Sequence, residues 1–179
     1  HLGQLIVKAR FPKGVVNIVP GYGLKAGAAL IKHPDIYKIA FTGSTMVGKK
    51  IMEEVGACGI KKLSLELGGK SPLVICEDAN IDLAVQIAQK CVFANQGQCC
   101  CAPSRTFVHE SIYDEFVKKS KELAECRVLG DPFAETTEQG PQVNKSQFDK
   151  IMSLIESGKQ EGAKLECGGE RFGNKGYFI

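Results

Sequence analysis

Hydrophobic residues follow two alternating periods along this chain. A spacing of two residues is typical of a strand with one buried face, and a spacing of three to four residues is typical of an amphipathic helix. Up to residue 67 these spacings predict strands at 15–19, 36–41 and 62–67 and helices at 26–33 and 42–55. Strands that alternate with helices form a parallel sheet with right-handed crossover connections. The first part of the chain is therefore expected to be an α/β unit.

The same alternation restarts after Gly68 and Gly69. It predicts strands at 72–76 and 105–108 and helices at 81–93, 112–126 and 146–162. Two glycines let the chain turn sharply because they need no room for a side chain. We therefore expect two α/β domains, 1–68 and 69–179. A site at their junction would lie between domains, where ligand clefts are common.

Composition adds the kind of protein that these elements build. Of the 179 residues, 44% are hydrophobic and 24% are charged, as in a globular protein with a sizeable core. The net charge is only +3 and basic residues are interleaved with acidic ones, so we expect no nucleic-acid or membrane partner. No apolar run is long enough for a membrane span, and the first residues do not resemble a secretion signal. An intracellular protein is expected.

Both ends of the chain fall inside apolar patterns. A helical stripe starts at Leu2 with no capping residue before it, and the chain stops in an apolar run at 177–179. We therefore expect the chain to be the middle part of a longer protein.

The chain is rich in cysteine. Its eight cysteines are Cys58, Cys76, Cys91, Cys99, Cys100, Cys101, Cys126 and Cys167. We expect reduced thiols, because the chain is long, strongly periodic and without a secretion signal. No metal site is expected, since there is no C-x-x-C pair and the three histidines have no metal-ligand spacing.

Three of these cysteines, Cys99, Cys100 and Cys101, are consecutive and follow a turn-forming Gly97-Gln98. Neighbouring side chains point in different directions, so at most one or two of the sulfurs can face a single cleft. The triplet fits a thiolate nucleophile presented on a turn. It fits equally well three small buried side chains, because free cysteine is among the most buried residue types.

A second candidate site is the stretch 41–48, where a strand passes into a helix and Gly43 and Ser44 form the turn. Exposed amides and the positive end of the helix can hold a pyrophosphate at such a turn. The stretch is neither a P-loop nor a G-x-G-x-x-G fingerprint. From the residues alone, an ordinary capped helix is the favoured interpretation.

The third candidate is Glu66, at the end of the strand 62–67. Alternation places Leu63, Leu65 and Leu67 on one face of this strand and Glu66 on the other. A carboxylate at the C-terminal end of a strand is well placed for catalysis and could take a proton from water. An ion pair with Lys62 or Lys70 competes with this interpretation, and the residues alone favour it.

Two of these stretches together resemble the active-site signatures of NAD(P)-dependent aldehyde dehydrogenases. The first is Glu66-Leu67-Gly68-Gly69-Lys70-Ser71-Pro72, and the second is Phe93-x-x-x-Gly97-Gln98-x-Cys100-x-Ala102, in which Cys100 follows Glu66 by 34 positions. Further resemblance runs through 11–21, 41–45, 111–116, 138–142 and 162–169, so it covers essentially the whole chain. These segments are most similar to the cytosolic and mitochondrial class 1 and 2 enzymes, including the retinal-oxidising branch.

This resemblance implies part of a Rossmann-like NAD-binding domain followed by the start of an α/β catalytic domain. It implies that Cys100 is the nucleophile, that a thiohemiacetal and then a thioester form on it, and that Glu66 activates the hydrolytic water. The backbone amide of Cys100 would supply one oxyanion donor. Pro103 departs from the residues usual in the family at that position, and we expect it to tune the site without abolishing it.

For the cofactor, the resemblance implies NAD in preference to NADP, with no metal. Gly43 and Ser44 would meet the pyrophosphate. The adenine side would be lined by Gly23, Gly27, Phe41 and Val47, and the nicotinamide end would be approached by Leu67 and Gly68.

The expected partner is a small-molecule aldehyde, and the full-length protein is expected to be a cytoplasmic homotetramer, with the mitochondrial matrix as the alternative location. The chain by itself is expected to be inactive. One competing hypothesis is a non-catalytic, crystallin-like structural relative. Another is a thiol-based redox or metal-binding module built on the cysteine triplet.

Overall fold

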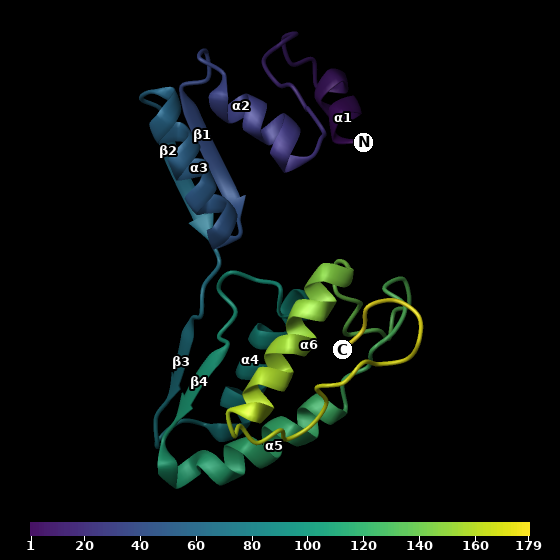
Figure 1. Cartoon of the computed structure of the whole chain (residues 1–179). Helices are drawn as coiled ribbons and strands as arrows, with labels where there is room; N and C mark the ends of the chain where they lie inside the picture. The colour runs from purple at the N-terminus through teal and green to yellow at the C-terminus, as the bar shows by residue number, and fades with distance from the viewer. The chain divides into compact units, whose positions relative to one another are not determined.

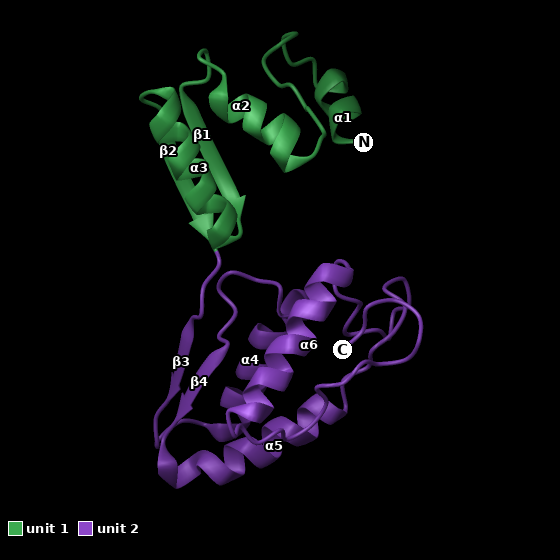
Figure 2. Ribbon diagram, viewed as in Figure 1, with its two compact units in different colours: residues 1–67 green, residues 68–179 purple.

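The computed structural model describes all 179 residues, which form two compact units, 1–67 and 68–179 (Figure 1 and Figure 2). Each unit combines helices with a pair of parallel strands. The α/β class expected from the sequence is therefore confirmed. None of the helices has the length and the apolar character that a membrane crossing requires.

Unit 1 is built around one strand–helix–strand crossover. Its elements are α1 (Leu2–Lys8), the π-helix η1 (Gly23–Gly27), α2 (Ala28–Lys32), β1 (Lys38–Gly43), α3 (Thr45–Cys58) and β2 (Lys62–Leu67). The strands β1 and β2 are parallel, with Thr42 opposite Glu66 in the register. Ile51 and Val55 are the buried hydrophobic residues of this unit, and both lie on α3.

The strand predicted at 15–19 is wrong. These residues form turns and irregular backbone, and Val15 and Val19 are 65% and 60% exposed. A strand is stable when its backbone groups pair with a neighbouring strand. In this structure β1 pairs only with β2, so the β-branched run has no partner.

Other boundaries in unit 1 shift for local reasons. The helix predicted at 26–33 starts earlier, at Gly23, and ends at Lys32, because Pro34 holds the preceding His33 in an extended conformation. The helix predicted at 42–55 begins at Thr45, because the Ser44 hydroxyl accepts a hydrogen bond from Val47 N at 3.3 Å and caps it.

Unit 2 packs helices against a second parallel pair. Its elements are β3 (Pro72–Ile75), α4 (Ile81–Phe93), the 3-10 turns η2 (Ala94–Gly97) and η3 (Glu110–Ile112), β4 (Arg105–Val108), α5 (Tyr113–Glu125) and α6 (Lys145–Gln160). The core joins Ile75 of β3, Val85 and Ala88 of α4, and Phe116 of α5. The bounds of α4 and β4 are those predicted from the sequence, and the other elements differ by one or two residues at their ends.

Candidate active site

A strained turn leads the chain from α4 into the cysteine triplet. Asn95 and Gln96 have φ angles of 52° and 56°, and Gly97 follows with a φ of 72°. Residues other than glycine adopt this left-handed conformation at a cost, so the surrounding contacts must hold the turn. Within it, Gln98 N donates to Asn95 O at 3.0 Å and Asn95 Nδ2 donates to Gln98 O at 3.0 Å.

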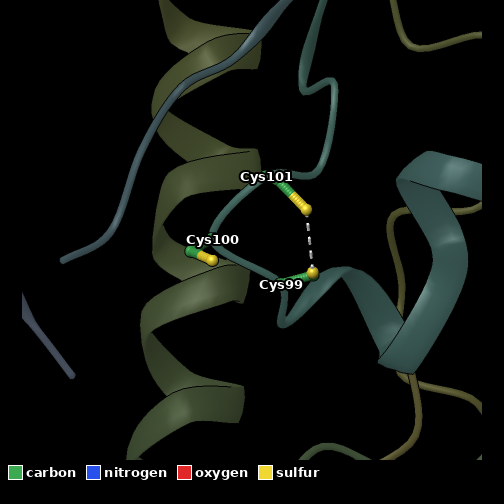
Figure 3. Close-up of side chains that lie close together, drawn as sticks. All are labelled: Cys99, Cys100 and Cys101. Atoms are coloured by element: carbon green, nitrogen blue, oxygen red, sulfur yellow. Dashed lines mark hydrogen bonds between the residues drawn. The ribbon is translucent and has the colours of Figure 1, made fainter. Parts of the chain in front are cut away.

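All three cysteines of the triplet are exposed, which removes the interpretation that they are small buried side chains. The sulfurs of Cys99 and Cys101 face each other at 3.5 Å, and the Cys100 side chain lies apart from that pair (Figure 3). Cys100 therefore takes no part in the contact between its neighbours, although its sulfur lies within 4.8 Å of both.

The contact between Cys99 and Cys101 also separates their acidities. A hydrogen bond from the Cys101 backbone, followed by one from its side chain, lowers the pKa of the Cys99 thiol. In turn, the hydrogen bond and the charge of Cys99 raise the pKa of Cys101. The two thiols therefore titrate as a coupled pair, in which the thiolate that forms first accepts a hydrogen bond from the other thiol.

The three sulfurs of the triplet lie within 4.8 Å of one another, close enough to hold one metal ion. No metal site was expected from the sequence, because the chain has no C-x-x-C pair and no histidines with metal-ligand spacing. The turn of the backbone nevertheless brings the sulfurs of three adjacent cysteines together. No histidine or carboxylate joins the cluster.

The triplet lies against the start of unit 2. A Cβ atom on Gly69 would come within 2.9 Å of the Cys100 carbonyl oxygen, so this close approach requires glycine. Beside it, Arg105 Nε donates to Lys70 O at 2.9 Å, and Arg105 N donates to Ser71 O at 3.4 Å. The second glycine of the Gly68-Gly69 pair and the cysteine turn are thus neighbours within one unit.

Glu66 lies in unit 1, on the exposed face of β2. Leu63, Leu65 and Leu67 are half-buried on the opposite face, which confirms the predicted alternation. Glu66 forms no ion pair with Lys62. The Lys70 ammonium donates to the Gly69 carbonyl at 3.2 Å. The carboxylate at the end of β2 is therefore exposed, without the competing ion pair on its own strand.

The turn between β1 and α3 joins the end of a strand to the capped N-terminus of a helix. β1 ends at Gly43, where a Cβ atom would meet the Phe41 ring at 2.5 Å, and Ser44 then caps α3. Val47 lies in the first turn of this helix, and Leu67 packs so closely on Gly48 that a Cβ there would lie 2.7 Å from Leu67 Cδ2. This end of α3 gathers Phe41, Gly43, Ser44, Val47 and Leu67 from the predicted cofactor residues.

The remaining cofactor candidates lie elsewhere. Gly23 and Gly27 are the first and last residues of η1, with open space around both positions. Gly68 is the first residue of unit 2.

Comparison with known proteins decides the family. The sequence model of the aldehyde dehydrogenase family matches residues 1–179. The chain belongs to the aldehyde dehydrogenase family. It is 60% identical over its whole length to human aldehyde dehydrogenase 1A1 and 59% identical to human retinaldehyde dehydrogenase 3. The resemblance expected from the two motifs is confirmed.

Solved structures agree with this assignment. An NAD+ complex of an aldehyde dehydrogenase from Bacillus cereus matches 98% of the chain with a TM-score of 0.95 and 47% sequence identity. The chain spans about a third of these relatives, 36% of human aldehyde dehydrogenase 1A1 and 36% of the Bacillus cereus protein.

Sequence reasoning missed two buried glutamines near the cysteine turn. Gln139 and Gln142 are buried, at 7% and 6% exposure, in an irregular segment that contacts the turn before the triplet. Glutamine is a mostly exposed residue type, and an irregular segment has no period that would mark a buried face. Only the resemblance had included this stretch, without a role for either residue.

A cavity of about 560 Å³ lies beside the same turn. It is lined by residues of α4 and α5 together with Asn95, Arg127 and Glu138. No cysteine of the triplet contributes to its wall. The cavity is therefore separate from the thiols of the aldehyde dehydrogenase motif.

Proposed function

We propose that this chain carries the nucleophile, the general base and part of the cofactor site of an NAD-dependent aldehyde dehydrogenase, which oxidises an aldehyde to a carboxylic acid. The observation that carries the proposal is that Cys100 takes no part in the hydrogen bond between its two neighbours, although its sulfur lies within 4.8 Å of theirs. Cys100 is exposed and lies within the family's cysteine motif. The motif that contains Glu66 precedes it at the family's spacing.

In the proposed reaction, the Cys100 thiolate attacks the carbonyl carbon of the aldehyde and forms a carbon–sulfur bond, which gives a thiohemiacetal. NAD supplies the acceptor for the hydride that leaves this carbon, and a thioester on Cys100 remains. Glu66 takes a proton from water while the water oxygen attacks the thioester carbonyl. The carbon–sulfur bond then breaks, which releases the acid and restores the thiolate.

The backbone of the triplet supports the assignment of the nucleophile. The Cys100 N–H donates no hydrogen bond within the chain, whereas Ala102 N, two residues later, donates to Cys99 O at 3.2 Å. A free amide next to the attacking sulfur is suited to stabilise the oxyanion that forms on the aldehyde oxygen. We assign the Cys100 N–H this role.

The end of unit 1 supports the assignment of the cofactor. The turn at Gly43 and Ser44 leads into the N-terminus of the 14-residue helix α3, and the amides and positive end of a helix N-terminus favour a pyrophosphate. The matched Bacillus cereus structure is an NAD+ complex. We therefore propose that unit 1 is part of the NAD-binding domain and unit 2 is part of the catalytic domain.

The likeness to human retinaldehyde dehydrogenase 3 supports retinaldehyde as a candidate substrate.

Serine variants of the three cysteines in the complete protein test the nucleophile. Cys100→Ser should lower aldehyde-dependent NADH formation by several orders of magnitude, because a serine hydroxyl without its own base is a far weaker nucleophile than a thiolate. Cys99→Ser and Cys101→Ser are matched controls that should keep most of the activity. NADH absorbance is the measurement, and an active Cys100→Ser variant would rule the assignment out.

A further inference from the structure

The left-handed turn before the cysteine triplet is held from outside by a second segment. We propose that Gln142 is a positioning residue, whose buried amide fixes the turn at 95–98 and thereby aims Cys100. The inference rests on the proposed role of Cys100 as the nucleophile. The holding segment, residues 140–143, is called the amide clamp below.

Three contacts join the amide clamp to the turn. Gln142 Nε2 donates to Gln96 O at 3.4 Å, and Val143 N donates to Gln98 Oε1 at 3.3 Å. The Gln96 amide, in its hydrogen-bonding orientation, accepts from Gly140 N at 3.1 Å and donates to Asn95 O at 3.2 Å. These contacts span more than 40 positions of sequence, so they place the turn within the fold of unit 2.

The contacts inside the turn do not fix its position within unit 2. Asn95 and Gln98 bond to each other through backbone and side chain, including Gln98 Nε2 to Asn95 O at 3.2 Å. These bonds close the turn on itself but leave it free to tilt on the end of α4. Because two of its residues are left-handed and are not glycine, the turn also needs outside contacts to stay in this conformation.

Gln142 is the buried and anchored part of the amide clamp. Its side chain is 6% exposed, so water cannot replace the bond to Gln96 when that bond is lost. Its own backbone N donates to Tyr177 O at 2.9 Å. The clamp therefore has a fixed support, and Cys100 follows the held turn by two residues.

The chain offers a matched control three residues away. Gln139 is buried to the same degree, at 7% exposure, but its Nε2 donates to Ile179 O at 3.1 Å and not to the turn. Each glutamine also has a buried Oε1 without a partner. Replacing either residue with methionine removes one buried amide of the same size, and only the replacement at 142 releases the turn.

The experiment compares Gln142→Met and Gln139→Met in the complete protein by three measurements. Thermal unfolding reports stability, hydrogen exchange reports the peptide that covers 94–102, and rapid mixing reports the rate of the first NADH turnover and the KM for NAD. We expect both variants to lose similar stability. Only Gln142→Met should exchange faster in this peptide and form NADH about fivefold more slowly, the factor that one hydrogen bond supplies, at an unchanged KM for NAD.

Two results would overturn the proposal. One is equal slowing of NADH formation in both variants, which would mean a general loss of structure. The other is a normal NADH rate in Gln142→Met, with or without faster exchange. If Gln142→Met does not fold, Gln142→Asn, whose side chain is one methylene shorter and does not reach Gln96 O, must show the same paired changes against Gln139→Asn. The proposed function itself fails separately, if Cys100→Ser remains active.

Discussion

At the scale of single residues, Gly69 is the position where the motif that contains Glu66 meets the motif that contains Cys100. A Cβ atom on residue 69 would lie 2.9 Å from the Cys100 carbonyl oxygen. This oxygen belongs to the backbone, so it cannot rotate away as a side chain could. The role of this glycine is a close approach, because its φ lies outside the left-handed region. A glycine before a strand thus shapes a loop about thirty residues later.

Gly69→Ala tests this contact. The added methyl group should push the Cys100 peptide out of place, at a cost of about 1–3 kcal/mol, and should slow NADH formation more than it lowers the thermal unfolding temperature. Gly158→Ala on α6 is the control, because a Cβ there meets only Ala163 Cβ, at 3.9 Å. Equal activity in the two variants would show that the contact does not position Cys100.

Residue patterns in the sequence identified the cysteine triplet as a candidate site but could not distinguish its three cysteines. Three adjacent cysteines look alike in one dimension, and the residues alone left burial and catalysis equally open. Only the turn at Asn95 and Gln96 sets Cys100 apart from the Cys99–Cys101 contact. The Gly97-Gln98 pair predicted a turn, but the left-handed backbone at Gln96 leaves no composition signal, so the sequence could not show which two sulfurs the turn brings into contact.

At the scale of elements, prediction succeeded where the residues of the element itself mark both its buried face and its ends. α4 has an apolar stripe and a cap in which Asn80 Oδ1 accepts from Leu83 N at 3.0 Å, and its bounds were predicted correctly. The run at 15–19 has strong β character but no strand beside it. Whether a segment pairs with a neighbouring strand depends on the whole fold and cannot be read from the residues of that segment alone.

The core of unit 2 makes a prediction at this scale. Phe116 of α5 is 6% exposed and packs with Ile75, Val85 and Ala88, so it joins α4, α5 and β3. Phe116→Ala should lower the free energy of unfolding by about 3 kcal/mol, through lost burial and the cavity left behind. Urea unfolding measures this loss. Phe133→Ala is the control, because Phe133 is 96% exposed, and an equal loss in both variants would contradict the assigned core.

At the scale of the whole molecule, the candidate residues are divided between two units. Glu66 is the penultimate residue of unit 1, and Cys100 lies in unit 2 beside Gly69. The family's first motif, 66–72, therefore crosses the boundary between the units, and the cysteine motif lies wholly in unit 2. The resemblance identified the two residues as a pair, and the glycine pair 68–69 had already predicted a domain boundary between them.

The central claim is that Cys100 carries the substrate and that Glu66 activates the water that releases it. The most direct test mixes the complete Glu66→Gln protein with NAD and an aldehyde, quenches the reaction in acid and maps the acyl group by mass spectrometry. We predict a burst of NADH and an acyl group on Cys100, because hydrolysis of the thioester is slowed. An acyl group on Cys99 or Cys101, or the absence of any acyl group, would contradict the account.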